Sequence, residues 1–186
     1  MARFTKEDLQ AVIGAASKDS TRFNINTIHI DGGKLVATNG HYLQSVDTGD
    51  APGVKPFTLG LVDATKLVKA MGKGQSVDIT NPITARIECA IEGGGTFEFE
   101  AMPIEYPAYA KIIPSGDVVR ASILVNAKYL KAICDAAIKS GRGDSRDAII
   151  KIDIREPLAP IHIKTNGVEK GGFEAVVMPV RDSKKK

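Results

Sequence analysis

A unit of about 60 residues that occurs three times constrains the fold of this chain more than any other feature. Three segments share one helical frame, in which a leucine (Leu9, Leu67 or Leu130) is followed four residues later by another apolar residue. Side chains at this spacing lie on one face of an α-helix, and that face must be buried. Each helix is predicted to begin at a capping residue four positions before its leucine: Thr5, Asp63 and Asn126.

Three short runs with the character of β-strands follow each helix, and turn signals separate them. The predicted strands cover residues 22–30, 34–38 and 42–47, then 76–80, 84–91 and 96–101, then 148–154, 161–165 and 173–178. Apolar runs at 57–61 and 118–125 lead into the second and third helices, and a stub at 2–4 leads into the first. The repeat is therefore strand, helix and three strands (βαβββ), which predicts an α+β fold.

A βαβββ repeat of this size buries too little surface to be stable alone, because its helix needs a sheet and its sheet needs a second layer. We expect the first two repeats (about 1–52 and 56–102, with a linker at 103–117) to form one complete domain over residues 1–115. The third repeat, 118–181, is then half a domain, followed by a basic tail at 182–186. This third repeat must pack on its own chain or on another copy.

Composition excludes several classes of protein. No apolar stretch approaches the roughly 20 residues of a membrane helix, and the charged N-terminus lacks the apolar core of a secretion signal. Two cysteines cannot form a disulfide framework, so we expect reduced thiols and a cytoplasmic location. With aromatic residues at 5% and no tryptophan, single-strand binding by base stacking is poorly supported.

The residues of a catalytic or metal site are not found at the required spacing. The histidines His29, His41 and His162 form no ligand-pair motif, and neither a nucleophile elbow nor a phosphate-binding glycine loop is present. We therefore expect a protein that is not an enzyme and that uses no metal and no cofactor.

Lysines mark two of the predicted helices, at spacings of three and four residues on the second helix and of three and eight residues on the third. They are Lys66, Lys69 and Lys73 on the second helix, and Lys128, Lys131 and Lys139, with Arg142 just beyond, on the third. Two interpretations stay open, a solvated helix face or a track for phosphates that is independent of DNA sequence. A net charge of +3 permits the second interpretation without requiring it.

Three motifs together resemble the bacterial DNA sliding clamp family, the beta subunit of DNA polymerase III. They are the strand link at 38–43 (TNGHYL), the linker from Glu105 to Pro114, and the closing segment at 176–181 (VVMPVR). The resemblance implies the DNA-clamp fold, with the middle domain of a clamp and half of its last domain. It also implies a non-catalytic processivity factor in DNA replication, whose helices face duplex DNA inside a ring of twelve repeats.

The same resemblance implies a hydrophobic cleft for the peptides of partner proteins. By it the cleft residues are Ile25, Thr38, Gly40, His41, Tyr42, Leu43, Pro114, Val176, Met178, Pro179 and Arg181. An apolar groove with small residues suits the leucine and phenylalanine side chains of an extended peptide. Two departures bear on peptide preference: Tyr42 replaces a basic residue of the family, and this chain continues beyond Arg181.

The implied partners are duplex DNA of any sequence, a DNA polymerase or other proteins with clamp-binding peptides, and further copies of the chain. Three repeats per chain require four chains for a ring of twelve, so we expect a homo-oligomer, a dimer or tetramer joined through the third repeat. The alternative is a clamp-like module that does not encircle DNA and competes for clamp-binding partners.

Overall fold

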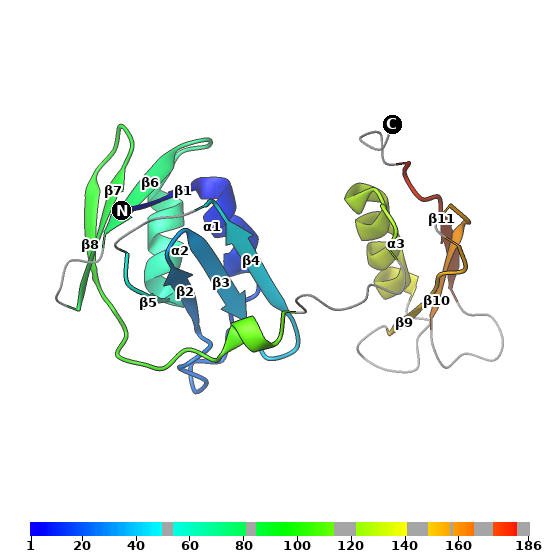
Figure 1. The fold of residues 1–186 in the computed structure, drawn as a ribbon, viewed down its shortest axis with the longest axis horizontal. Helices are drawn as coiled ribbons and strands as arrows, with labels where there is room; N and C mark the ends of the chain where they lie inside the picture. Colours follow the sequence, from blue (N-terminus) through cyan, green and yellow to red (C-terminus); the bar gives the residue numbers. More distant parts are fainter. Residues whose placement is uncertain are drawn as a thin grey trace. The chain divides into compact units, whose positions relative to one another are not determined.

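The computed structural model describes residues 1–49, 54–80, 85–113, 122–140, 149–156, 158–165 and 173–181. The chain divides into two compact units, Met1–Pro114 and Ser115–Lys186, here called the N-terminal and C-terminal units (Figure 1). In the described part of the chain, no helix has the length and apolar character needed to cross a lipid bilayer.

Two four-stranded antiparallel sheets and two helices make up the N-terminal unit. The first sheet has the order β4-β3-β2-β5, and the second has the order β1-β6-β7-β8. The first sheet comprises β2 (Thr27–Asp31), β3 (Lys34–Thr38), β4 (Leu43–Asp47) and β5 (Phe57–Gly60). The second comprises β1 (Ala2–Thr5), β6 (Ser76–Thr80), β7 (Arg86–Ile91) and β8 (Thr96–Glu100).

The leading strands of the two repeats are exchanged. Strand β1 belongs to the first repeat but pairs with β6 of the second, so that Phe4 lies opposite Val77. Strand β5 belongs to the second repeat but pairs with β2 of the first, so that Leu59 lies opposite Ile28. Each repeat thus covers the sheet edge that the other leaves open, and an uncovered edge is a site for unwanted pairing.

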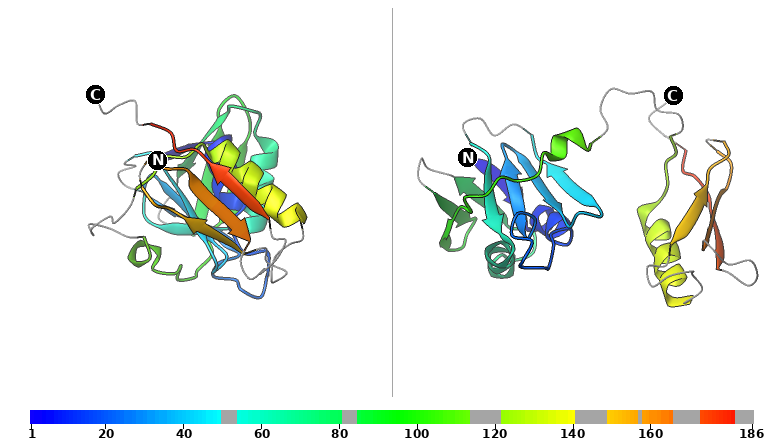
Figure 2. Two further views of the ribbon diagram at one scale, coloured as in Figure 1. Left: turned by 90° about the vertical axis from the view of Figure 1, so that its right-hand side faces the viewer. Right: turned by 90° about the horizontal axis from the view of Figure 1, so that it is seen from below.

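Helices α1 (Lys6–Ile13) and α2 (Leu61–Ala70) pack against each other, and Figure 2 shows them side by side. The leucines that defined the repeat, Leu9 and Leu67, are both fully buried. They belong to one hydrophobic core that also takes inward residues of both sheets, such as Ile28 and Ile79. The helical frame in the sequence therefore identified the buried helix faces.

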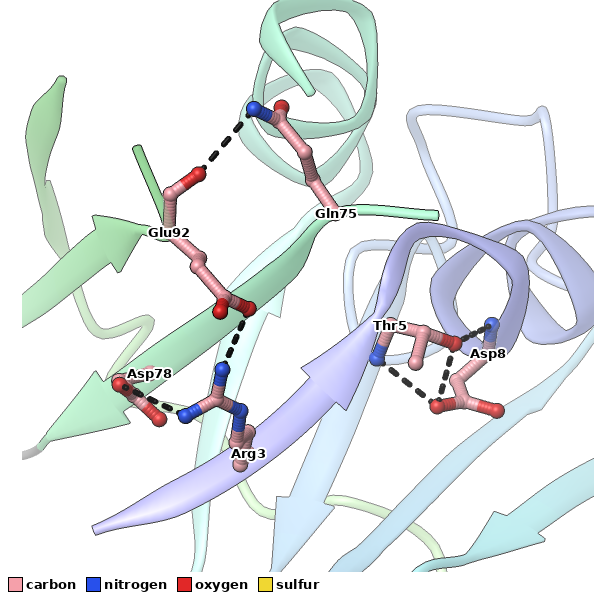
Figure 3. Close-up of polar contacts among 6 residues, drawn as sticks. All are labelled: Arg3, Thr5, Asp8, Gln75, Asp78 and Glu92. Atoms are coloured by element: carbon pink, nitrogen blue, oxygen red, sulfur yellow. Dashed lines mark hydrogen bonds and ion pairs between the residues drawn. The ribbon is translucent and has the colours of Figure 1, made fainter. Parts of the chain in front are cut away.

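The helix starts confirm two of the three predicted caps. Thr5 and Asp8 form a capping box at α1, in which each side chain accepts a hydrogen bond from the other residue's backbone N–H (Figure 3). In the C-terminal unit, Asn126 Oδ1 accepts from the Lys128 N–H at 2.9 Å. The prediction for α2 was wrong: its cap is Gly60, and Asp63 lies within the first turn.

The C-terminal unit contains one helix, α3 (Ala127–Ser140), and one sheet of order β11-β10-β9. The strands are β9 (Ile150–Asp153), β10 (Ile161–Thr165) and β11 (Glu174–Val177). Helix α3 covers one face of this sheet (Figure 1), where Ile161, Ile163 and Val177 of the sheet and Ala137 of the helix are the buried apolar residues among those described. This core is far smaller than the core of the N-terminal unit.

Two predicted strands differ from the structure. Residues 22–26, expected in a strand, form a turn in which the Arg22 carbonyl accepts from the N–H groups of Ile25 and Asn26. Of the leading strand predicted at 118–125, only 122–125 is described, and those residues are not in a regular strand. The linker contains a short 3-10 helix, η1 (Tyr109–Lys111), that the sequence did not predict.

Candidate functional site

A pocket of about 290 Å³ opens in the N-terminal unit beside the link between β3 and β4. Six residues expected in the peptide cleft line it: Ile25, Thr38, Gly40, His41, Tyr42 and Leu43. Four further lining residues were not predicted: Arg22, Asn24, Pro107 and Ile112. The pocket therefore joins the β3–β4 link, the turn before β2 and the linker that follows β8.

The link between β3 and β4 is held in one conformation by its own side chains. Asn39 Oδ1 accepts from the N–H groups of His41 and Tyr42, at 2.9 and 3.2 Å. Thr38 Oγ1 donates to the Tyr42 carbonyl at 2.7 Å and accepts from the Gly40 N–H at 3.1 Å. Because these bonds satisfy the turn locally, its outward side chains are available to the pocket.

Gly40 and Arg22 fit together at one wall of the pocket. Gly40 has a φ of 91°, a conformation that other residues rarely adopt. A Cβ placed there would lie 2.7 Å from Arg22 Nη2. Arg22 Nη1 in turn donates to the Asn39 carbonyl at 3.0 Å, so the guanidinium lies over the turn. Any larger residue at position 40 would displace the guanidinium of Arg22 from the pocket wall.

Tyr42 connects the pocket to the end of helix α1. Its hydroxyl donates to the Gly14 carbonyl at 2.9 Å, and Gly14 is the C-cap residue of that helix. The side chain remains 49% exposed, so the ring covers the helix end on one side and meets solvent on the other. A basic residue at this position, as in the resembled family, would present a charge here instead of a ring.

Aromatic contacts fix the linker that contributes Pro107 and Ile112 to the pocket. Tyr106 stacks on His29, and the Tyr109 hydroxyl donates to Asp31 Oδ2 at 2.9 Å. Burial raises the pKa of Tyr106 to about 12, and burial together with the adjacent Asp31 carboxylate raises the pKa of Tyr109 to about 12. Both phenols are therefore neutral hydrogen-bond donors at physiological pH.

The remaining cleft candidates lie in the C-terminal unit, apart from Pro114, which lies outside the described residues. Val176 is 59% exposed and Met178 is 61% exposed, while Pro179 is half-buried and Arg181 is exposed. The pocket itself is lined only by residues of the N-terminal unit. The association of the two groups into one cleft stays a prediction.

Two of the lysines predicted on the second helix lie on the exposed side of α2. Lys66 and Lys69 are exposed, whereas Ala64 and Leu67 on the other side are buried. Lys73 is also exposed but does not belong to the helix, which ends at Ala70 because the next residue is already extended. The predicted stripe therefore continues from α2 into the turn that follows.

Helix α3 carries a similar exposed set. Lys128, Lys131 and Lys139 are all exposed, and Lys131 forms an ion pair with Asp135 one turn later. Arg142 lies outside the described residues. On α2, Lys66 likewise forms an ion pair with Asp63 at 2.9 Å. Part of the positive charge on each helix is therefore offset by a neighbouring carboxylate.

The outer face of the second sheet has the opposite charge. Glu88 on β7 lies directly opposite Glu98 on β8, and Glu100 follows on the same face. All three are exposed, whereas the alternate residues Ile87 and Cys89 are buried. Among the described residues, Arg86 offsets this charge by an ion pair with Glu98 at 3.3 Å.

The fold matches solved structures of bacterial sliding clamps. The DNA polymerase sliding clamp of Bacillus subtilis matches with a TM-score of 0.70 at 20% identity, over 96% of this chain and 48% of that chain. DNA polymerase III subunit beta of Borrelia burgdorferi, solved with a natural product, matches with a TM-score of 0.72 at 14% identity, over 95% and 47%. The sliding clamp of Bartonella birtlesii bound to griselimycin matches with a TM-score of 0.66 at 22% identity, over 97% and 52%.

No protein-family model and no curated protein matches this sequence. The chain spans about half the length of the clamp chains that it matches. The α+β arrangement expected from the repeats is thus confirmed as a shortened form of the sliding-clamp fold.

Proposed function

We propose that this protein is a non-catalytic DNA tether of the sliding-clamp kind, acting as a processivity factor for a DNA polymerase in the cytoplasm. The observation that carries the proposal is the separation of charge in the N-terminal unit. Exposed lysines lie on and beside α2, and exposed glutamates lie on the outer face of β7 and β8. This distribution favours the approach of a phosphate backbone from the helix side, without reading of bases.

The lysines that best fit this role are those that form no ion pair with a carboxylate among the described residues. Among the described residues, Lys69 and Lys73 on and after α2, and Lys128 and Lys139 on α3, form no ion pair, unlike Lys66 and Lys131. A phosphate contact with an unpaired lysine releases counterions without first breaking an ion pair. We therefore assign the larger share of DNA contact to these four residues.

Peptides of partner proteins are proposed to dock in the pocket beside the β3–β4 link. Its apolar residues, among them Ile25, Leu43 and Pro107, suit the aliphatic and aromatic side chains of an extended peptide. Arg22 offers a positive charge at the pocket wall to a carboxylate on the same peptide. Val176, Met178, Pro179 and Arg181 would contribute a further part of the cleft, as the resemblance implies.

Duplex binding measured across salt concentrations tests the DNA proposal. A fluorescently labelled duplex should bind with little dependence on sequence, and log K should fall linearly with log salt. The Lys69→Ala, Lys73→Ala double variant should make this slope shallower by about 0.9 for each phosphate that the protein no longer neutralises. Arg86→Ala, which removes a cation from the acidic sheet face, is the matched control and should leave the slope unchanged.

The second candidate function is a peptide-binding module that does not encircle DNA and competes for clamp-binding partners. The observation that favours it is that the pocket is formed by the N-terminal unit alone, without any need for a ring. Peptide binding that persists at full affinity, together with the absence of duplex binding at low salt, would select this function and refute the DNA tether.

A further inference from the structure

We infer that the third repeat is completed by the third repeat of a second copy of this chain. In this dimer, the leading segment of each copy, residues 122–126, pairs with the free edge of β9 in the other copy. The inference does not depend on the DNA or peptide proposals, because it rests on the way in which the first two repeats complete each other.

The N-terminal unit supplies the pattern. In both repeats, the residue before the helix cap lies opposite the first inward residue of the other repeat's sheet: Phe4 opposite Val77, and Leu59 opposite Ile28. All four side chains are at most 1% exposed. The exchange is reciprocal, so two identical repeats related by a two-fold axis could form the same contacts.

Within its own repeat, the leading segment of the third repeat has the same contact at a backbone carbonyl as the leading strands β1 and β5 have in theirs. In each repeat, the carbonyl two residues before the helix cap accepts a hydrogen bond from a residue just after the repeat's last strand. In the first repeat, Thr48 Oγ1 donates to the Arg3 carbonyl at 3.4 Å. In the second and third repeats, the Met102 N–H donates to the Thr58 carbonyl at 2.9 Å, and the Val180 N–H donates to the Leu124 carbonyl at 2.7 Å. One edge of the leading segment at 122–126 is therefore hydrogen-bonded in the same way as β1 and β5 are in the complete N-terminal unit.

Strand β9 lacks the neighbour that its counterparts have. Among the described residues it pairs only with β10, whereas β2 pairs with β3 and β5, and β6 pairs with β7 and β1. Ile152 on β9 lies opposite the fully buried Ile163 and shares its inward face, yet Ile152 is 46% exposed. The inward isoleucines Ile28 on β2 and Ile79 on β6 are both 0% exposed.

Helix α3 lacks a second helix in the same way. In the N-terminal unit, where α1 packs against α2, Ala64 on α2 and Met71 at its C-cap flank the buried Leu67 and are themselves buried. The residues at the same spacing from Leu130 are Ala127, which is exposed, and Cys134, which is half-buried. Ile138, four residues beyond Cys134, is 63% exposed. An apolar flank of α3 therefore meets solvent.

A second copy fits this surface better than any described part of the same chain does. Both sheets of the N-terminal unit already have four strands, and both of its leading strands are used. In the described residues, no further βαβββ repeat remains to complete the third. Among the described residues of the C-terminal unit, the buried apolar side chains are Ala137, Ile161, Ile163 and Val177. This core is small for an independent domain, so burial of further apolar surface is strongly favoured.

The pattern also fixes the register of the dimer. The residue before the cap of α3 is Val125, and the first inward residue of β9 is Ile150. Val125 of one copy should therefore lie opposite Ile150 of the other, and Ile123 opposite Ile152. Ile123 and Val125 already pack against the small core, whereas Leu124 between them is 48% exposed, as the alternation of a strand requires.

Light scattering coupled to size-exclusion chromatography tests the inference. The wild-type protein should have the mass of at least two chains, and Ile152→Lys should reduce it to that of one chain, 19.8 kDa. Because Ile152 is partly exposed, this variant should still fold as a monomer, as circular dichroism would show. The matched control is Leu158→Lys, at an equally apolar but 59% exposed position outside the strands, and it should keep the wild-type mass.

A disulfide tests the register directly. Paired residues in antiparallel strands are close enough for a disulfide bond, so the Ile123→Cys, Ile152→Cys double variant should form a covalent dimer that a reductant reverses. Neither single variant should do so to the same extent. A wild-type mass of one chain at high micromolar concentration, an unchanged dimer in Ile152→Lys, or a disulfide closed within a single chain would overturn the inference.

Discussion

The imidazole ring of His29 lies face to face on the phenol ring of Tyr106, with ring centroids 4.6 Å apart and planes 6° from parallel. His29 belongs to β2 and Tyr106 to the linker that follows β8, so this stack joins residues that are far apart in the sequence. Tyr109 adds an edge contact to His29 at 5.8 Å. The position of Pro107 and Ile112 at the pocket wall depends on this cluster.

The stack predicts a loss of stability in mild acid. Burial lowers the pKa of His29 below its ordinary value of 6.5, although the Asp31 charge opposes the shift. In mild acid, His29 therefore binds a proton more readily in the unfolded chain than in the folded chain. The free energy of unfolding falls as the pH drops below about 6.5. The variant His29→Phe, which keeps an aromatic ring on Tyr106, should weaken this dependence in urea unfolding at pH 7 and pH 5. An unchanged pH dependence in the variant would contradict the assignment.

The linker tyrosines predict a second loss of stability in alkali. The pKa values of Tyr106 and Tyr109 are raised from 10.0 to about 12, so the folded chain keeps protons that the unfolded chain loses. The stabilisation is complete below about pH 10 and is lost between about pH 10 and pH 12. Tyr109→Phe should flatten this decline in thermal unfolding. The prediction fails if the decline is equally steep in the variant.

Gly40→Ala should weaken peptide binding beyond its cost in stability. The substitution forces an unfavourable φ, which costs about 1 kcal/mol, and it also displaces Arg22 from the turn. Gly32→Ala is the matched control, since Gly32 has a φ of 58° but open space around its Cβ position. Both variants should lose similar stability in urea. Only Gly40→Ala should reduce the affinity for a labelled acidic, leucine-containing peptide, and equal affinities in the two variants would argue against this pocket.

Leu67→Ala should destabilise the N-terminal unit by about 3 kcal/mol, because its side chain is 0% exposed in the shared core. Val62→Ala on the same helix is the control: Val62 is 64% exposed, so the change should cost less than about 0.5 kcal/mol. Chemical denaturation of the two variants measures the difference. Equal costs would mean that the repeat frame does not mark the buried face of α2.

Much of the local structure could be predicted from the sequence, because the repeat shows in apolar spacing and turn residues. The strands at 34–38, 76–80 and 161–165 have the predicted ends. The wrong cap at Asp63 has a simple cause: β5 runs straight into α2 at Gly60, and glycine offers no side-chain capping signal. The exchange of leading strands could not be predicted, because strand pairing over long sequence separation leaves no trace in local patterns.

The pocket was predicted only where its residues are close in sequence. Thr38, Gly40 and Leu43 belong to one short motif, whereas Arg22 lies in a run that was expected to be a strand. Pro107 and Ile112 lie in the linker between the second and third repeats, and the contacts of Tyr106 with His29 and of Tyr109 with Asp31 hold this linker beside the pocket. The two tyrosines on either side of Pro107, Tyr106 and Tyr109, are the signal that could have indicated their position.

Retention on DNA circles tests the central proposal, a clamp-like tether, most directly. The protein would be concentrated in the presence of a nicked circular plasmid or of the same plasmid cut once, so that chains assemble around the DNA. Both samples would then be washed at high salt on a gel-filtration column, which removes purely electrostatic binding. A clamp-like tether should elute with the circle and be lost from the linear form. Equal loss from both forms would contradict a ring around duplex DNA.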